Sequence, residues 1–186
     1  MVKTMKAAEK DAILQVADLM VLAAKTAPKG SGRDTVEAAV ITGEDKDRLR
    51  DHMIEMQKRM DYQIFVRDAG NVDESVAVVV IGMKDTYFGL TSCGMCGAEN
   101  CGKAKKAGVS CVFNMTDTGI AVGSAVSVAA DHRVDNRVMY TVGRAALEMG
   151  FLSDQVKTIV WGIPLYAGSK DITFDRAPGS VVNAGK

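Results

Sequence analysis

The feature that most constrains this chain of 186 residues is the placement of its four cysteines. They are Cys93, Cys96, Cys101 and Cys111, spaced C-x2-C-x4-C-x9-C, and no other cysteine occurs in the sequence. Cysteines that only fill a hydrophobic core would be scattered along the chain. The grouping therefore predicts one object that binds all four thiols, either an iron–sulfur cluster or a zinc ion.

The spacing favours the iron–sulfur cluster. Structural zinc is more often held by two separated C-x2-C pairs, whereas this chain has one such pair. A crowded triplet followed by one remote cysteine is typical of loops that bind iron–sulfur clusters. Structural zinc remains the alternative, followed by redox-active or unliganded thiols. A disulfide framework is weaker still, because residues 1–15 lack the uninterrupted apolar segment of a secretory signal.

Glycines follow three of the cysteines, at Gly94, Gly97 and Gly102. Glycine reaches positive φ without steric cost, so the chain can curl and direct backbone N–H groups at the sulfurs. Such N–H···S bonds tune the potential of a cluster. The eight residues 103–110 leave room for one or two helical turns before the chain returns through Gly108. Three lysines in this segment, Lys103, Lys105 and Lys106, are candidates for raising the potential of a cluster or for docking an acidic electron donor. The alternative is that they are solvated side chains of a short exposed helix.

The composition excludes several classes of partner. Lysine plus arginine and aspartate plus glutamate number 23 each, and aromatic residues make up 5%. Neither value favours nucleic-acid binding or attraction to an anionic membrane. No apolar run is long enough to cross a bilayer. We expect a single cytoplasmic domain over residues 1–186, with the cysteine loop at 92–112 inside it.

Hydrophobic periodicity predicts an α+β fold with a mixed sheet flanked by helices. The predicted helices cover residues 8–26, 44–60, 117–132 and 134–149. The predicted strands cover residues 36–42, 62–66, 77–83 and 158–164, with a short further strand at 171–174. Strand 77–83 is apolar on both faces and should be central. We expect at least part of the last ten residues to be mobile.

Specific side chains are predicted to face inward or to mark helix ends. The inner stripe of helix 44–60 is Leu49, Met53, Met56 and Met60. Helix 134–149 should stop at Gly150, and Trp161 should pack against the sheet. No catalytic constellation is evident, and the polar run 131–137, which contains His132, is either an interhelical turn or a binding segment.

Helix 117–132 is apolar nearly all round, so it should be buried, with Asp117 near its N-cap. Its small residues allow another helix to approach closely. These residues are Gly119, Gly123, Ala125 and Ala129. The approaching helix belongs either to this chain or to a second copy in a homodimer, and the sequence leaves both open.

The cysteine loop also resembles a known module. The run from Cys93 to Cys101, C-G-M-C-G-A-E-N-C, followed by Cys111, is similar to the small four-cysteine [4Fe–4S] domain of electron-transport subunits and corrinoid iron–sulfur proteins. The resemblance implies that Cys93, Cys96, Cys101 and Cys111 bind one [4Fe–4S] cluster. The gap before Cys111 is shorter than in many members of that module.

Two further resemblances concern the rest of the chain. Leu22–Pro28, Asp117–Ala121 and Gly162–Pro164 resemble short motifs of the nitroreductase flavoprotein superfamily, in the same order. Roughly residues 8–176 are similar to a family of anaerobic bacteria and archaea described as containing a ferredoxin-type domain. These resemblances imply a nitroreductase-like α+β fold with an inserted four-cysteine loop, and they imply no particular substrate.

The nitroreductase resemblance also suggests FMN. The superfamily's arginine-rich N-terminal segment and its Asn-Gln-Pro-Trp run are missing here, so the candidate contacts to the flavin phosphate are Lys29 and Arg33, on a glycine-rich loop. A solvated loop is the alternative interpretation. The sequence thus predicts an iron–sulfur redox protein, an oxidoreductase if flavin binds, whose partner is a redox protein or a small-molecule electron acceptor. The alternative is a non-catalytic module with structural zinc.

Overall fold

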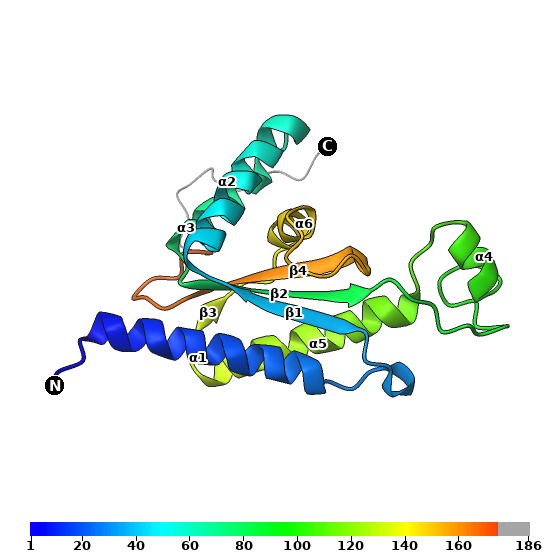
Figure 1. The fold of residues 1–186 in the computed structure, drawn as a ribbon, viewed down its shortest axis with the longest axis horizontal. Helices are drawn as coiled ribbons and strands as arrows, with labels where there is room; N and C mark the ends of the chain where they lie inside the picture. Colours follow the sequence, from blue (N-terminus) through cyan, green and yellow to red (C-terminus); the bar gives the residue numbers. More distant parts are fainter. Residues whose placement is uncertain (175–186) are drawn as a thin grey trace.

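The computed structural model describes residues 1–174, which form a four-stranded sheet covered by helices on both faces (Figure 1). In chain order the elements are α1 (Met5–Thr26), the 3-10 turn η1 (Gly30–Gly32), β1 (Val36–Ile41), α2 (Gly43–Met60), α3 (Ile64–Glu74), β2 (Ala77–Lys84), α4 (Cys101–Lys106), α5 (Val112–Asp131), β3 (Asp135–Asn136), α6 (Tyr140–Glu148) and β4 (Val156–Tyr166). The strand order is β1-β2-β4-β3. The α+β class is confirmed, but the sheet is not mixed, because all three described strand pairings are antiparallel.

The sheet separates two hydrophobic cores. Helices α1 and α5 lie on one face, and α2, α3 and α6 lie on the other (Figure 1). Val79 and Ile81 of β2 pack toward α1 and α5, whereas Val78 and Val80 pack toward the opposite helices. Successive side chains of a strand point to opposite faces, so an apolar run supplies both cores. The predicted central position of strand 77–83 is confirmed.

Other predictions hold with shifted boundaries. Helix 8–26 and strand 36–42 correspond to α1 and β1, and strand 158–164 is the middle of the longer β4. In α2 the side chains of Leu49, Met53 and Met56 are buried as expected. Met60 is 41% exposed, because α2 ends there and leaves the core.

The prediction of a strand at 62–66 is wrong. The sequence Tyr-Gln-Ile-Phe-Val is rich in residues with high β propensity, but α3 begins at Ile64. Phe65, Ala69 and Val72 lie on one face of this helix and enter the core beside Met53 and Met56. Helical spacing of these buried residues overrides the local propensity.

The helix predicted at 134–149 is shorter than expected. Residues 135–136 form β3 against β4, and Met139 pairs with Gly162, so α6 starts only at Tyr140. The end is as predicted: Gly150 has φ of 72°, and its N–H donates to Leu147 O. Residues 171–174 are a turn rather than a strand, since the N–H groups of Thr173 and Phe174 donate to the Asp171 carboxylate.

Helix α5 begins at Val112, five residues before the prediction, so Asp117 is not an N-cap but lies inside the helix. The helix is buried on one face only. Ala125 and Ala129 face α1 in the core, while Gly119 and Gly123 are exposed with open space beside them. Ala125 and Ala129 therefore make the close contact with another helix of this chain. For Gly119 and Gly123, contact with a second copy in a homodimer stays a prediction.

Between β2 and α5 the chain leaves the body of the protein as a loop that carries α4, at the end of the sheet (Figure 1). This loop contains all four cysteines. None of the helices within residues 1–174 combines the length and hydropathy that crossing a bilayer requires. The expectation for the last ten residues lies outside the described residues, and the single-domain assignment over 1–186 stays a prediction.

Candidate metal centre and adjoining cavity

Glycines shape the cysteine loop. Gly94, Gly97 and Gly108 have φ of 66°, 83° and 67°, a region that favours glycine, and Gly97 N–H donates to Gly94 O at 3.0 Å. Gly102 is expected to bend the loop at positive φ like the other two glycines that follow cysteines. It lies instead inside α4 and has no positive φ. Asn100 caps α4, since its side-chain oxygen accepts from Lys103 N–H at 3.0 Å. The predicted short helix between the third and fourth cysteines is confirmed.

The four cysteines are free thiols. Cys93, Cys96 and Cys101 are partly buried, and Cys111 is 5% exposed at the N-terminus of α5. Within residues 1–174, no three histidine, cysteine, aspartate or glutamate side chains form a group that could hold a metal ion. The loop thus supplies four donors of the kind that iron or zinc requires, not yet converged on one point, and their assignment as ligands stays a prediction.

Tyr87 contacts the limb of the cysteine loop that returns to α5. Its phenol oxygen donates to the Val109 carbonyl at 2.9 Å. Burial, the Asp85 carboxylate and the thiols of Cys111, Cys96 and Cys101 raise the pKa of Tyr87. The donor chemistry fits a sulfur-ligated centre, because all four free thiols lie on this one loop.

Contacts with distant segments hold the base of this loop. The Asn114 side-chain amide donates to Lys84 O at 3.2 Å and to Thr86 O at 2.6 Å, which ties α5 to the end of β2. The ring of Phe88 lies 4.8 Å from that of Phe113. The first residues after β2 are thereby fixed before the chain enters the cysteine loop.

The two candidate flavin-phosphate contacts lie beside this base. Arg33 stacks on the Phe88 ring at 4.7 Å and donates to the carbonyls of Tyr87 and Phe88 at 3.2 Å each. The Lys29 ammonium donates to three carbonyls near the end of α1, those of Ala24, Lys25 and Ala27. Burial lowers the pKa of Lys29, against the opposing charge of Asp34. Both cations have protein partners, and their contact with a flavin phosphate stays a prediction.

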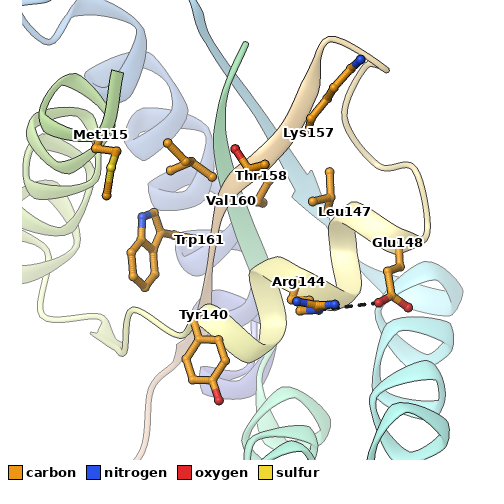
Figure 2. Close-up of a pocket in the computed structure, with 10 residues that line it drawn as sticks. Met115, Tyr140, Arg144, Leu147, Glu148, Lys157, Thr158, Val160 and Trp161 are labelled. Atoms are coloured by element: carbon orange, nitrogen blue, oxygen red, sulfur yellow. Dashed lines mark ion pairs between the residues drawn. The ribbon is translucent and has the colours of Figure 1, made fainter. Parts of the chain in front are cut away.

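A cavity of about 510 Å³ opens between α5, α6 and β4 (Figure 2). Its wall combines apolar side chains with two cations and the Glu148 carboxylate. The residues that line it include Met115, Tyr140, Arg144, Leu147, Lys157 and Trp161. A second cavity of about 560 Å³ lies against the cysteine loop and is lined by Tyr87, Gly108 and Ser110. Both cavities include Lys157 and Thr158, so they adjoin each other.

Glu148 limits the positive charge at the first cavity. Its carboxylate is held by Arg59 at 2.6 Å and by His52 at 3.3 Å, and it lies 3.7 Å from Arg144 Nε. Burial alone would raise the pKa of Glu148, but the contacts with Arg59 and His52 outweigh it and leave this pKa lowered. Burial and a hydrogen bond with Tyr62 raise the pKa of Tyr140 to about 12, so its phenol stays neutral.

Sequence reasoning assigned Trp161 only to packing on the sheet. It does pack against the core, and it also lines the cavity. No short-range pattern marks Tyr140, Arg144 and Lys157 as neighbours, because they lie on α6 and β4, which come together only in the folded protein. His132, at the end of α5, is exposed.

Residues 107–176 match the model of the family described as "Uncharacterized protein containing a ferredoxin domain (DUF2148)". A protein of Archaeoglobus fulgidus is 40% identical over 168 residues, which are 86% of this chain and 89% of that protein. The chain belongs to this ferredoxin-domain family. The matched segment contains Cys111, α5, α6 and β4, so it spans most of the first cavity's wall, while the other three cysteines precede it.

Solved structures show that the ferredoxin-domain protein has the nitroreductase fold. A Desulfovibrio desulfuricans protein, assigned as a nitroreductase and determined with FMN, is 15% identical with a TM-score of 0.57, covering 88% of this chain and 79% of that one. NADPH:FMN oxidoreductase from Vibrio harveyi, complexed with NAD⁺, has a TM-score of 0.55 at 11% identity, covering 84% of this chain and 60% of that one. The fold resemblance stated from the sequence is confirmed.

Proposed function

We propose that this protein is an iron–sulfur redox protein whose cysteine loop holds one [4Fe–4S] cluster. The ligands are Cys93, Cys96, Cys101 and Cys111. The observation that carries the proposal is that four free thiols lie on one glycine-bent loop. The family description, which names a ferredoxin domain, supports the same chemistry. When bound, such a cluster supplies one-electron transfer.

The residues of the loop have separate tasks. Gly94 and Gly97 bend the backbone between the first three ligands, and α4 spaces the third from the fourth. Tyr87 holds the returning limb through Val109. Since Lys103 pairs with Glu99, the exposed cations Lys105 and Lys106 are the ones that would face an acidic redox partner.

We propose further that the protein also binds FMN and acts as an oxidoreductase. This proposal is supported by the nitroreductase fold and by the FMN in the Desulfovibrio structure. Lys29 and Arg33 are the proposed phosphate contacts, and each would have to exchange or share a backbone carbonyl partner to bind it. A flavin would let the protein link one-electron and two-electron donors.

The test is metal and acid-labile sulfide analysis of protein purified without oxygen, together with a visible spectrum. About four irons and four sulfides per chain, with a broad absorbance that bleaches on reduction, are expected. Cys96→Ser should lose most of the iron, whereas Ser92→Ala, an exposed position next to Cys93, should keep it. A flavin spectrum in the same scan would support the oxidoreductase form. Stoichiometric zinc in a colourless protein would overturn the proposal in favour of a structural zinc module.

A further inference from the structure

The cysteine loop projects from the end of the sheet and keeps apolar side chains at its surface (Figure 1). Leu90, Met95 and Val109 are 43%, 66% and 38% exposed. Two of them lie beside α4. Cys101 N–H donates to Leu90 O at 3.4 Å, and Val109 N–H donates to Ala104 O at 3.0 Å. Large apolar side chains exposed together on one segment are a feature of surfaces that contact other proteins.

The second cavity, of about 560 Å³, continues this surface as an open depression. None of the residues that line it is buried. Val109 lies between two of them, Gly108 and Ser110, so the apolar surface and the depression are contiguous. Sites for small molecules bury most of the surface of their ligand. A depression whose walls are all exposed or half-buried therefore suits a side chain of a docked protein better than a free small molecule.

The depression carries more positive than negative charge. Lys105 of α4 and Lys157 of β4 line it, and Asp85 is the one carboxylate among the lining residues of the described chain. Both lysines are exposed, and neither forms an ion pair within residues 1–174. Figure 2 shows the Lys157 side chain extending away from the first cavity. Lys106, the next residue of α4, adds another exposed cation, so the charge of this region is complementary to an acidic surface.

We propose that an acidic electron-carrier protein docks on this region, which we call the loop surface: Leu90, Met95, Val109 and the depression between Lys105 and Lys157. A carboxylate of the partner enters the depression, and an apolar patch of the partner covers the exposed apolar side chains. The lysines steer the encounter and set the orientation, whereas the apolar contact slows dissociation.

The loop surface and the proposed cluster ligands belong to the same loop. Cys93, Cys96 and Cys101 are only partly buried, so a docked protein would approach them closely. That the partner passes one electron to the cluster, and is itself oxidised by one electron, rests on the proposed function. The docking itself does not.

The binding experiment uses the full chain purified without oxygen. The probe is oxidised plant-type ferredoxin, a small acidic protein, and the reference is oxidised cytochrome c, a basic protein of similar size. Calorimetry at about 20 mM NaCl should give saturable one-to-one binding of the ferredoxin with a Kd on the order of 10–100 μM, and no binding of cytochrome c. At about 200 mM NaCl the affinity should fall at least about 3-fold, because salt screens exposed charges.

Variants locate the contact. Lys105→Glu and Lys157→Glu should each weaken ferredoxin binding roughly 3- to 10-fold, since each replaces an attractive charge with a repulsive one. Lys58→Glu makes the same change in net charge at an exposed position of α2, and it should alter the affinity by less than about 1.5-fold. Val109→Ser should weaken binding roughly 3-fold at both salt concentrations, because apolar contact is not screened. All four positions are exposed, so these substitutions should not disturb folding.

Three results would overturn the inference: no saturable binding at about 1 mM ferredoxin, an affinity unchanged in both Lys105→Glu and Lys157→Glu, or an equal loss of affinity in Lys58→Glu. A fourth concerns citrate, titrated at constant ionic strength. Citrate binding that both charge reversals abolish, without any binding of the ferredoxin, would make the depression a site for small anions instead.

Iron analysis of the same sample separates this inference from the proposed function. Binding of ferredoxin to protein without iron would remove the proposed function and keep the loop surface. Iron without binding of ferredoxin would remove the loop surface and keep the proposed function.

Discussion

The Tyr87 phenol donates a hydrogen bond of 2.9 Å to the backbone carbonyl of Val109, two residues before Cys111. Tyr87 lies three residues after the end of β2, and Val109 lies on the limb that returns to α5. This contact therefore closes the base of the loop on which Cys93, Cys96 and Cys101 lie. A side chain that no ligand motif includes thus helps to set where the fourth ligand lies relative to the first three.

Tyr87→Phe should loosen the loop without unfolding the protein. Loss of one hydrogen bond costs about 0.5–1.5 kcal/mol, so the urea midpoint should fall only slightly. Release of iron to a chelator, measured without oxygen, should become faster by a factor of several. Ser127→Ala, which removes an exposed hydrogen bond of α5 away from the loop, should leave the release rate unchanged. Identical rates for Tyr87→Phe and the natural protein would contradict this role.

Gly143→Ala should separate α6 from β4. A Cβ at this position would lie 2.1 Å from the Val160 carbonyl oxygen, and a backbone atom cannot move aside as a flexible side chain can. We expect a loss of about 3 kcal/mol or more in the free energy of unfolding, measured by urea denaturation.

The matched control for this substitution is Gly70→Ala. Gly70 lies in the exposed interior of α3 and would have no atom within 4 Å of its new Cβ. Alanine should stabilise the helix there by about 0.5–1 kcal/mol. Similar changes in the free energy of unfolding for Gly143→Ala and Gly70→Ala would show that the close approach of α6 to β4 does not contribute to stability.

Asp117→Ala should remove the hydrogen bond that connects α5 to η1. The buried Asp117 carboxylate accepts a hydrogen bond of 3.0 Å from Gly30 N–H, 87 residues away in the sequence. Without an acceptor, the N–H group loses its partner, which costs about 1–3 kcal/mol in urea unfolding. Asp117→Asn retains an acceptor oxygen and should lose less than half as much. A loss of unfolding free energy in Asp117→Asn that is larger than the loss in Asp117→Ala would exclude this explanation.

Glu37→Gln should change how stability depends on pH. Hydrogen bonds from Ser153, at 2.6 Å from its hydroxyl and 2.9 Å from its N–H, hold the pKa of Glu37 below its ordinary value of 4.5. A carboxylate with a lowered pKa contributes stability that is fully present above about pH 4.5 and is lost as the pH falls through the folded-state pKa. The melting temperatures of the two proteins should therefore differ near pH 7, and the difference should shrink as the pH falls below about 4.5.

The control for this pH series is Glu9→Gln, an exposed position on α1. Its melting temperature should run parallel to that of the natural protein across the same range. A gap between Glu37→Gln and the natural protein that stays constant down to the lowest pH would mean that Glu37 contributes nothing through its charge.

The errors of sequence reasoning have specific causes. Tyr62–Val66 has high β propensity, yet packing of Phe65 against α2 makes α3 a helix. Asp117 resembles a capping residue in the sequence, but α5 begins at Val112, and the Asp117 carboxylate accepts instead from Gly30 N–H in a distant loop. Neither contact leaves a signal in a window of neighbouring residues, because both partners come from elsewhere in the chain.

The donor set of the candidate metal centre and most of the helices and strands could be predicted from the amino-acid sequence. Both depend on short-range patterns, namely the spacing of four cysteines and the periodicity that predicts α1 and β2. Folding in three dimensions is what places Tyr87 against Val109 at the base of the cysteine loop, and what makes α5, α6 and β4 enclose a cavity with Trp161. Those relationships depend on the strand order β1-β2-β4-β3, which is set by the simultaneous burial of two cores, a balance over the whole chain rather than over any one segment.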